Sequence, residues 1–195
     1  KELGTMSAQK ADLIGRVCQE IIEGNLHDQF MVGVIQGGAG TSTNMNTNEV
    51  IANRCLELMG KPFGDYVNFH PIDDVNRSQS TTDVYPTAIK TAMVISTKRL
   101  LAENVKLAAA FARKGTEFAH VLKVGRTQMQ DAVPMTLGQE FNGFAHTISE
   151  DYDRLNETIP WLNEINMGAT AIGTGITADP RYAAAVCRHL AEITG

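Results

Sequence analysis

The sequence of 195 residues predicts a mainly α-helical fold. Apolar residues recur at three- and four-residue steps over long stretches, which is the period of a helix with one buried face. One such stretch, from Thr87 to Gly115, has no interior Gly or Pro and exceeds ~25 residues, a length typical of a helical bundle. Segments rich in Gly, Ser, Thr and Asn separate the stretches and favour turns.

The first half of the chain divides into helices and loops by these signals. One amphipathic helix is expected from Ser7 to Gly24, and a second from about Asn48 to Met59. The segment QGGAGTSTNMNTN, residues 36–48, is expected to be a loop between them. A Ser or Thr of SQSTTD then caps a long helix from Asp83 to about Gly115, with Pro86 tolerated in its first turn.

The second half begins with HVLKVGRTQMQDAVPMT, where Gly125 and Pro134 interrupt helicity and a helix-to-helix connection is expected. Another long helix should run from Leu137 to about Asn166, bent or broken near Pro160. The Gly- and Thr-rich loop NMGATAIGTGITADP precedes a closing amphipathic helix from Tyr182 to Ile193.

Composition excludes several classes of function. The chain has a formal charge of −5, and its Lys and Arg residues are scattered. It therefore lacks the continuous basic surface that binds nucleic acid. No apolar run is long enough to span a membrane and no signal pattern opens the chain, so a cytoplasmic location is expected. The cysteines have no CxxC spacing and the histidines no ligand spacing, so neither a metal nor another cofactor is expected.

Three polar segments carry hydrogen-bond donors. In GGAGTSTNMN the hydroxyl groups of residues 41–43 can donate to a carboxylate, and in SQSTTD hydroxyl groups and a helix start can face an anion. GRTQMQ presents Arg126, Thr127 and Gln128 in succession. Taken singly, each segment is better explained as a turn or a helix cap.

Their combination changes this interpretation. The motifs GTSTNMNTNEVIANR, HPIDDVNRSQSTTDVYPTA, GRTQMQDAVPMTLGQEF and NMGATAIGTGI occur in this order. Together they resemble the aspartase/fumarase superfamily over nearly the whole chain. QGGAGTSTNMN, NMGATAIGTGI and Gln128 are more similar to the aspartase branch, because fumarases usually show SGTQTNMN, a GGTAVGTGLN-type loop, and His after GRT.

The resemblance implies a fold of long bundled helices, with residues 1–82 forming the later part of an N-terminal domain and 83–195 the first part of a central helical domain. It implies a homotetramer, with each site drawing loops from three subunits. The implied reaction eliminates ammonia from L-aspartate to give fumarate through an enediolate. The implied partners are therefore this amino acid and the dicarboxylate, with no nucleic acid or membrane.

Matched to the family, Thr41, Ser80 and Thr81 are expected to donate to the substrate's β-carboxylate. Thr127 and Gln128 are expected near the leaving amino group. Thr82 stands where the family's STND motif has Asn, which makes it a possible substrate contact.

The family's general base is a serine on a loop of the SSxMPxKxN type, and no such string occurs in this sequence. No catalytic base is therefore expected within the chain, which is interpreted as an internal fragment. Ile72 replaces the Asn of the family's HPND motif, and no secondary dicarboxylate site is assigned there.

Two alternatives remain at the level of sequence. One is fumarase, or another lyase of the superfamily with a different leaving group. The other is a non-catalytic scaffold or degenerate relative. The four hydroxyl donors Thr41, Ser80, Thr81 and Thr127 favour an enzyme, because a scaffold does not need donors from three separate segments.

Overall fold

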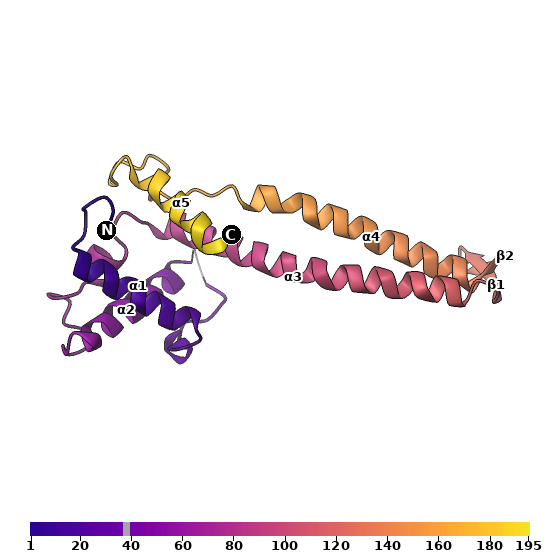
Figure 1. Ribbon diagram of the computed structural model, residues 1–195, viewed down its shortest axis with the longest axis horizontal. Helices are drawn as coiled ribbons and strands as arrows, with labels where there is room; N and C mark the ends of the chain where they lie inside the picture. The colour runs from indigo at the N-terminus through magenta and orange to yellow at the C-terminus, as the bar shows by residue number, and fades with distance from the viewer. Residues whose placement is uncertain (37–39) are drawn as a thin grey trace. The chain divides into compact units, whose positions relative to one another are not determined.

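The computed structural model describes residues 1–36 and 40–195, and the protein is mainly α-helical as predicted. The chain forms two compact units, Lys1–Ile89 with Ile165–Gly195, and Lys90–Glu164 (Figure 1). The long helix α3, Thr81–Glu117, begins in the first unit and continues in the second. The other elements of the first unit are α1 (Ala8–Ile22), η1 (His27–Gln29), α2 (Thr41–Leu58), η2 (Pro71–Val75) and α5 (Tyr182–Thr194).

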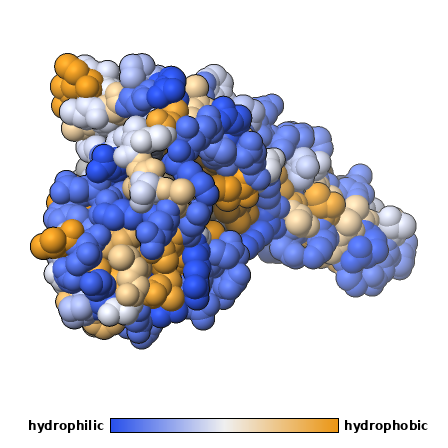
Figure 2. Space-filling model, turned by 60° about the vertical axis from the view of Figure 1, so that its left-hand side comes forward, coloured by the Kyte–Doolittle hydropathy of each residue, from blue (hydrophilic) through white to orange (hydrophobic). Residues whose placement is uncertain are grey.

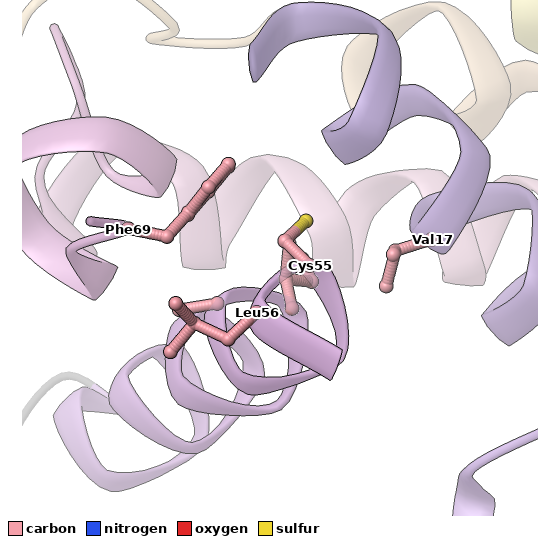
Figure 3. Packing of buried hydrophobic residues seen from close by; sticks show 6 residues of the cluster. Val17, Cys55, Leu56 and Phe69 are labelled. Atoms are coloured by element: carbon pink, nitrogen blue, oxygen red, sulfur yellow. The ribbon is translucent and has the colours of Figure 1, made fainter. Parts of the chain in front are cut away.

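The core of the first unit lies between α1 and α2. Its buried residues are Val17, Ile51, Ala52, Cys55, Leu56 and Phe69, whose side chains Figure 3 shows from close by. The Ser7 hydroxyl accepts a hydrogen bond from Lys10 N and caps α1, which confirms the helix expected there. Arg54 of α2 also binds Glu20 of α1 over 2.7 Å.

The second helix begins earlier than the sequence predicts. A loop was expected over residues 36–48, but α2 starts at Thr41; Gly37 to Ala39 lie outside the described residues. Asn44 and Asn48 favour turns when their side chains are free to bond the local backbone. Here both are buried and donate to the side chain of Asn76, so tertiary contacts replace the local ones.

A buried carboxylate joins α1 to η2. Asp74 Oδ2 accepts hydrogen bonds from Lys10 Nζ over 2.6 Å and from His70 N over 2.8 Å. Burial acts to raise the pKa of Asp74, but these two donors outweigh burial and lower that pKa below its usual value. Asp74 is therefore an ionised link between the two elements.

In the second unit, the larger part of α3 is paired with α4. The helix α4, Leu137–Leu162, begins with a capping box of Thr136 and Gln139 and contains Pro160 without a break. It ends four residues before the expected Asn166. An aromatic cluster joins the two helices, with ring centroids 5.5–6.0 Å apart. Phe111 belongs to α3, Phe118 follows its last residue, and Phe141 and Phe144 belong to α4.

A β-hairpin connects these helices, where the sequence predicted only a connection. Its strands are β1, Leu122–Thr127, and β2, Gln130–Thr136, paired antiparallel. The two turn residues, Gln128 and Met129, have φ of 49° and 60°. Two-residue turns with both φ values positive usually carry Asn-Gly or Gly-Gly, so this hairpin lacks its ordinary sequence signal.

Several large apolar side chains of the second unit are exposed. Figure 2 shows apolar residues in patches between polar ones on the face it presents. None of the described helices combines the length and the apolar character that a membrane span requires. Apolar residues of α3 and α4 that are about half exposed or more include Met93, Leu100, Val105 and Trp161.

Candidate active site

The N-termini of α2 and α3 meet in the first unit. Asn44, in the first turn of α2, donates from Nδ2 to Thr81 Oγ1 of α3 over 2.9 Å. Gly40, just before Thr41, has φ of 85°, and a Cβ there would lie 2.2 Å from the ring of Tyr85. Glycine is therefore required at this close approach, which brings the first turns of both helices together.

The contact with Asn44 fixes the hydrogen-bond role of Thr81. An amide nitrogen can only donate, so the Thr81 oxygen is the acceptor and its own proton points elsewhere. Asn44 Nδ2 also lies 3.3 Å from Asn76 Oδ1, which holds the amide group in this orientation. The Thr81 hydroxyl can thus donate to a ligand at the helix start.

Ser80 caps α3, as the sequence predicts. Its main-chain N–H donates to Asp83 Oδ1 over 2.8 Å, and its hydroxyl accepts from Thr82 N over 3.3 Å. Because α3 starts at Thr81 rather than Asp83, Pro86 lies in the second helical turn, and its expected place in the first turn was wrong.

Thr82 faces the loop of the NMGATAIGTGI motif. Its hydroxyl lies 3.1 Å from the carbonyl oxygen of Thr170 and 3.0 Å from that of Ala171. It also lies 2.9 Å from Ser80 Oγ. A carbonyl can only accept, so Thr82 donates to the loop and Ser80 donates to Thr82.

Asp83 lies beneath these contacts with an exposed fraction of 0%. Its second carboxylate oxygen accepts the N–H of Thr170 over 2.8 Å. Tyr182, which begins α5, lies close by. Burial is the main cause that raises the pKa of the Tyr182 phenol. A hydrogen bond with Gln79 acts to lower this pKa, and the charge of Asp83 adds a smaller upward shift.

The predicted site residues fall into both units. Thr41, Thr81 and Thr82 lie in the first unit on the first turns of α2 and α3, and Ser80 lies just before α3. Thr127 and Gln128 lie in the second unit, exposed at the tip of the hairpin. Beside them, Arg126 Nε and Asp131 Oδ1 form an ion pair of 2.9 Å across the two strands.

The sequence did not single out the residues that contact the start of α3. Asn44, Asn166 and Thr170 contact Thr81, Thr82 and Asp83, yet none was proposed as a site residue. The available signal was their place inside the matched motifs. Among the described residues, no group of three or more His, Cys, Asp or Glu side chains could hold a metal ion.

A family model described as Lyase matches residues 1–195. The chain belongs to this lyase family. Its similarity to curated members is high: an aspartate ammonia-lyase of Pseudomonas canavaninivorans is 57% identical over 196 residues, covering 100% of this chain and 41% of that protein. An aspartate ammonia-lyase of Helicobacter pylori strain 26695 is 50% identical over 194 residues, covering 100% of this chain and 42% of that protein.

Solved structures of a fumarate lyase and a fumarase share the fold. A fumarate lyase:delta crystallin from Brucella melitensis bound to cobalt has a TM-score of 0.94 and 53% identity, over 100% of this chain and 42% of that one. A class II fumarase from Schistosoma mansoni has a TM-score of 0.91 and 34% identity, over 99% of this chain and 40% of that one. The chain thus spans about two fifths of the length of these relatives.

Proposed function

We propose that the complete protein containing this chain is an aspartate ammonia-lyase, which converts L-aspartate to fumarate and ammonia. The identity of 57% to the Pseudomonas canavaninivorans enzyme over the whole chain supports this substrate. The structural observation that carries the proposal is the meeting of two helix N-termini beside the Thr81 hydroxyl, whose oxygen accepts from Asn44. Helix N-termini and free hydroxyl protons both favour a carboxylate.

The elimination develops negative charge on the substrate, and this charge must be stabilised. Removing a proton from the carbon beside the β-carboxylate leaves an enediolate, which then expels the amino group as its carbon–nitrogen bond breaks. Donors aimed at the carboxylate oxygens stabilise the charge that develops there. We assign this role to Thr41, Ser80 and Thr81. Ser80 must turn its proton from Thr82 to the substrate when the substrate binds.

The remaining functional groups complete the proposed site. Thr127 and Gln128 are assigned to the amino group, and a serine on a loop of the SSxMPxKxN type, outside this sequence, to proton abstraction. Thr82 is a further candidate contact. The exposed apolar residues of α3 and α4 support burial against other subunits, as in the homotetramer that we propose. Residues 1–82 and 83–195 are proposed to belong to its N-terminal and central domains.

The substrate is tested by adding L-aspartate or L-malate to the purified complete protein and following fumarate by its ultraviolet absorbance. We expect fumarate from aspartate, with equimolar ammonia. Fumarate from malate alone identifies a fumarase instead, and no fumarate from either substrate contradicts both assignments. The three free cysteines are consistent with our proposal that the enzyme works in the cytoplasm.

A further inference from the structure

Thr170 is held by both of its main-chain groups. Its N–H donates to Asp83, and its carbonyl oxygen accepts from the Thr82 hydroxyl. Thr170 is 7% exposed and has φ of 60°. A β-branched residue rarely adopts this left-handed conformation, which persists only where the surroundings enforce it. Two adjacent residues of α3 therefore hold a strained residue of another segment.

A third contact joins the same elements. Pro86 has no N–H, so it cannot make the helical hydrogen bond to the carbonyl oxygen of Thr82, four residues earlier. Asn166 Nδ2 donates to that oxygen over 3.0 Å instead. The segment from Asn166 to Ala171, called here the 166–171 segment, thus binds the first turn of α3 through main-chain and side-chain groups.

The Asp83 carboxylate connects this segment to the proposed donors. One oxygen accepts the N–H of Thr170 and the other accepts the N–H of Ser80, each over 2.8 Å. A shift of the 166–171 segment must therefore move or release the carboxylate that orients the main chain of Ser80. Ser80 and the neighbouring Thr81 are two of the three donors assigned to the substrate carboxylate.

We propose that Asp83 is a positioning residue for the elimination: by holding Thr170 in its strained conformation, it fixes the 166–171 segment against α3 and keeps Ser80 and Thr81 in place for the transition state. This inference rests on the proposed function. Asp83 itself is fully buried, so it acts through the groups that it holds. Its effect should therefore fall mainly on kcat, because small displacements of aligned groups reduce turnover steeply.

The first test substitutes Asp83→Asn in the complete protein. Asparagine has one acceptor oxygen, so its NH2 group faces either the Ser80 or the Thr170 N–H, and one contact is lost. We expect kcat for L-aspartate to fall by up to about 10²-fold, with a smaller change in KM. Asp74→Asn is the matched control: Asp74 is also a buried carboxylate that accepts a main-chain N–H, but its partners are Lys10 and His70. Its kcat per folded site should stay unchanged.

The second test asks whether the strain of Thr170 links Asp83 to turnover. Glycine adopts φ of 60° without the cost that a side chain imposes. Thr170→Gly, added to Asp83→Asn, should therefore restore part of the lost kcat. A loss that the double substitution does not reduce overturns the proposal, as does an Asp83→Asn kcat no lower than that of Asp74→Asn.

Two further measurements test how Asp83 and Thr82 hold the 166–171 segment. If Asp83→Asn does not fold, Thr82→Val releases the Thr170 carbonyl at an exposed site, and Thr82→Ser keeps the hydroxyl. Residues 166–171 should then exchange their amide hydrogens faster in the valine variant than in the serine variant, because only valine releases the Thr170 and Ala171 carbonyl oxygens; equal rates contradict the proposal. Amide hydrogen exchange needs no substrate: residues 166–171 should exchange faster in Asp83→Asn than in Asp74→Asn, and unchanged protection refutes the positioning role even if the complete protein does not act on aspartate.

Discussion

The Asn44 amide donates to the Thr81 hydroxyl across the junction of α2 and α3 and so determines where the Thr81 proton can point. Asn44→Asp should reverse this contact, because a carboxylate accepts the Thr81 proton and takes it from the substrate. We expect turnover of the complete protein to fall by about 10²-fold, the usual effect of losing one such donor.

Asn48→Asp is the control for this change. Asn44 and Asn48 both donate to Asn76 Oδ1, over 3.3 and 3.1 Å, so both substitutions add a charge to α2 and lose that contact. Only the first alters Thr81. Steady-state kinetics with L-aspartate should separate the two variants, and equal losses of kcat contradict the role given to the Thr81 proton.

Thr41→Ala should depress turnover by about 10²- to 10³-fold if Thr41 donates to the developing enediolate. Thr41 is exposed, so its removal should leave the subunit assembly intact, as measured by analytical ultracentrifugation. Thr47→Ala removes a hydroxyl from the same helix that bonds the carbonyl oxygen of Thr43, and it should retain turnover. Dissociation of the assembly by Thr41→Ala, with unchanged turnover per assembled site, means that the role of Thr41 is structural.

The approach of α2 to α3 can be tested with two glycines. Gly24→Ala places a side chain at φ of 96° with no atom within 4 Å of the new Cβ, so it should cost only about 1–2 kcal/mol of unfolding free energy. Gly40→Ala has similar strain and also clashes with Tyr85, adding about 1–3 kcal/mol. Urea unfolding of both variants measures the difference, and equal losses rule out a tight Gly40–Tyr85 contact.

The contribution of Asp74 to stability should depend on pH. Its pKa is lower in the folded protein than in the unfolded chain, so its stabilising effect is complete above the unfolded pKa of about 3.9. The effect is lost as pH falls through the lower pKa of the folded state. The difference in urea midpoint between the unsubstituted protein and Asp74→Asn should therefore be constant near neutral pH and shrink below about pH 4. A difference that grows with acid contradicts the lowered pKa.

The 195-residue chain alone should have no measurable lyase activity. Proton abstraction needs a base within hydrogen-bond reach, and the family's serine loop has no counterpart in this sequence. The exposed apolar residues of α3 and α4 should also cause the isolated chain to associate. An assay of this chain, purified from a host without aspartase, measures the activity; accumulation of fumarate from L-aspartate contradicts the assignment of the base to that loop.

The sequence by itself determined that the chain is built from long helices and which segments are rich in the hydroxyl groups that we propose as donors. Helical periodicity is local information, because it records which face of one element is buried, and it predicted α1, α3, α4 and α5 to within a few residues. Taken singly, these hydroxyl-rich segments predicted only turns and helix caps; the resemblance to the aspartase/fumarase superfamily is what made Thr41, Ser80 and Thr81 donor candidates.

Tertiary structure decided what those residues contact. Asn44 favours a turn when alone, yet it lies in α2 because Asn76 and Thr81 accept its side-chain amide. The hairpin forms at Gln128 and Met129 although neither is a usual residue for positive φ. Asn166 donates to the carbonyl oxygen of Thr82, 84 residues earlier, which Pro86 cannot bind because it has no N–H. Hydrogen-bond partners distant in sequence leave no periodic signal, so the arrangement that holds the proposed donors depends on the folded chain.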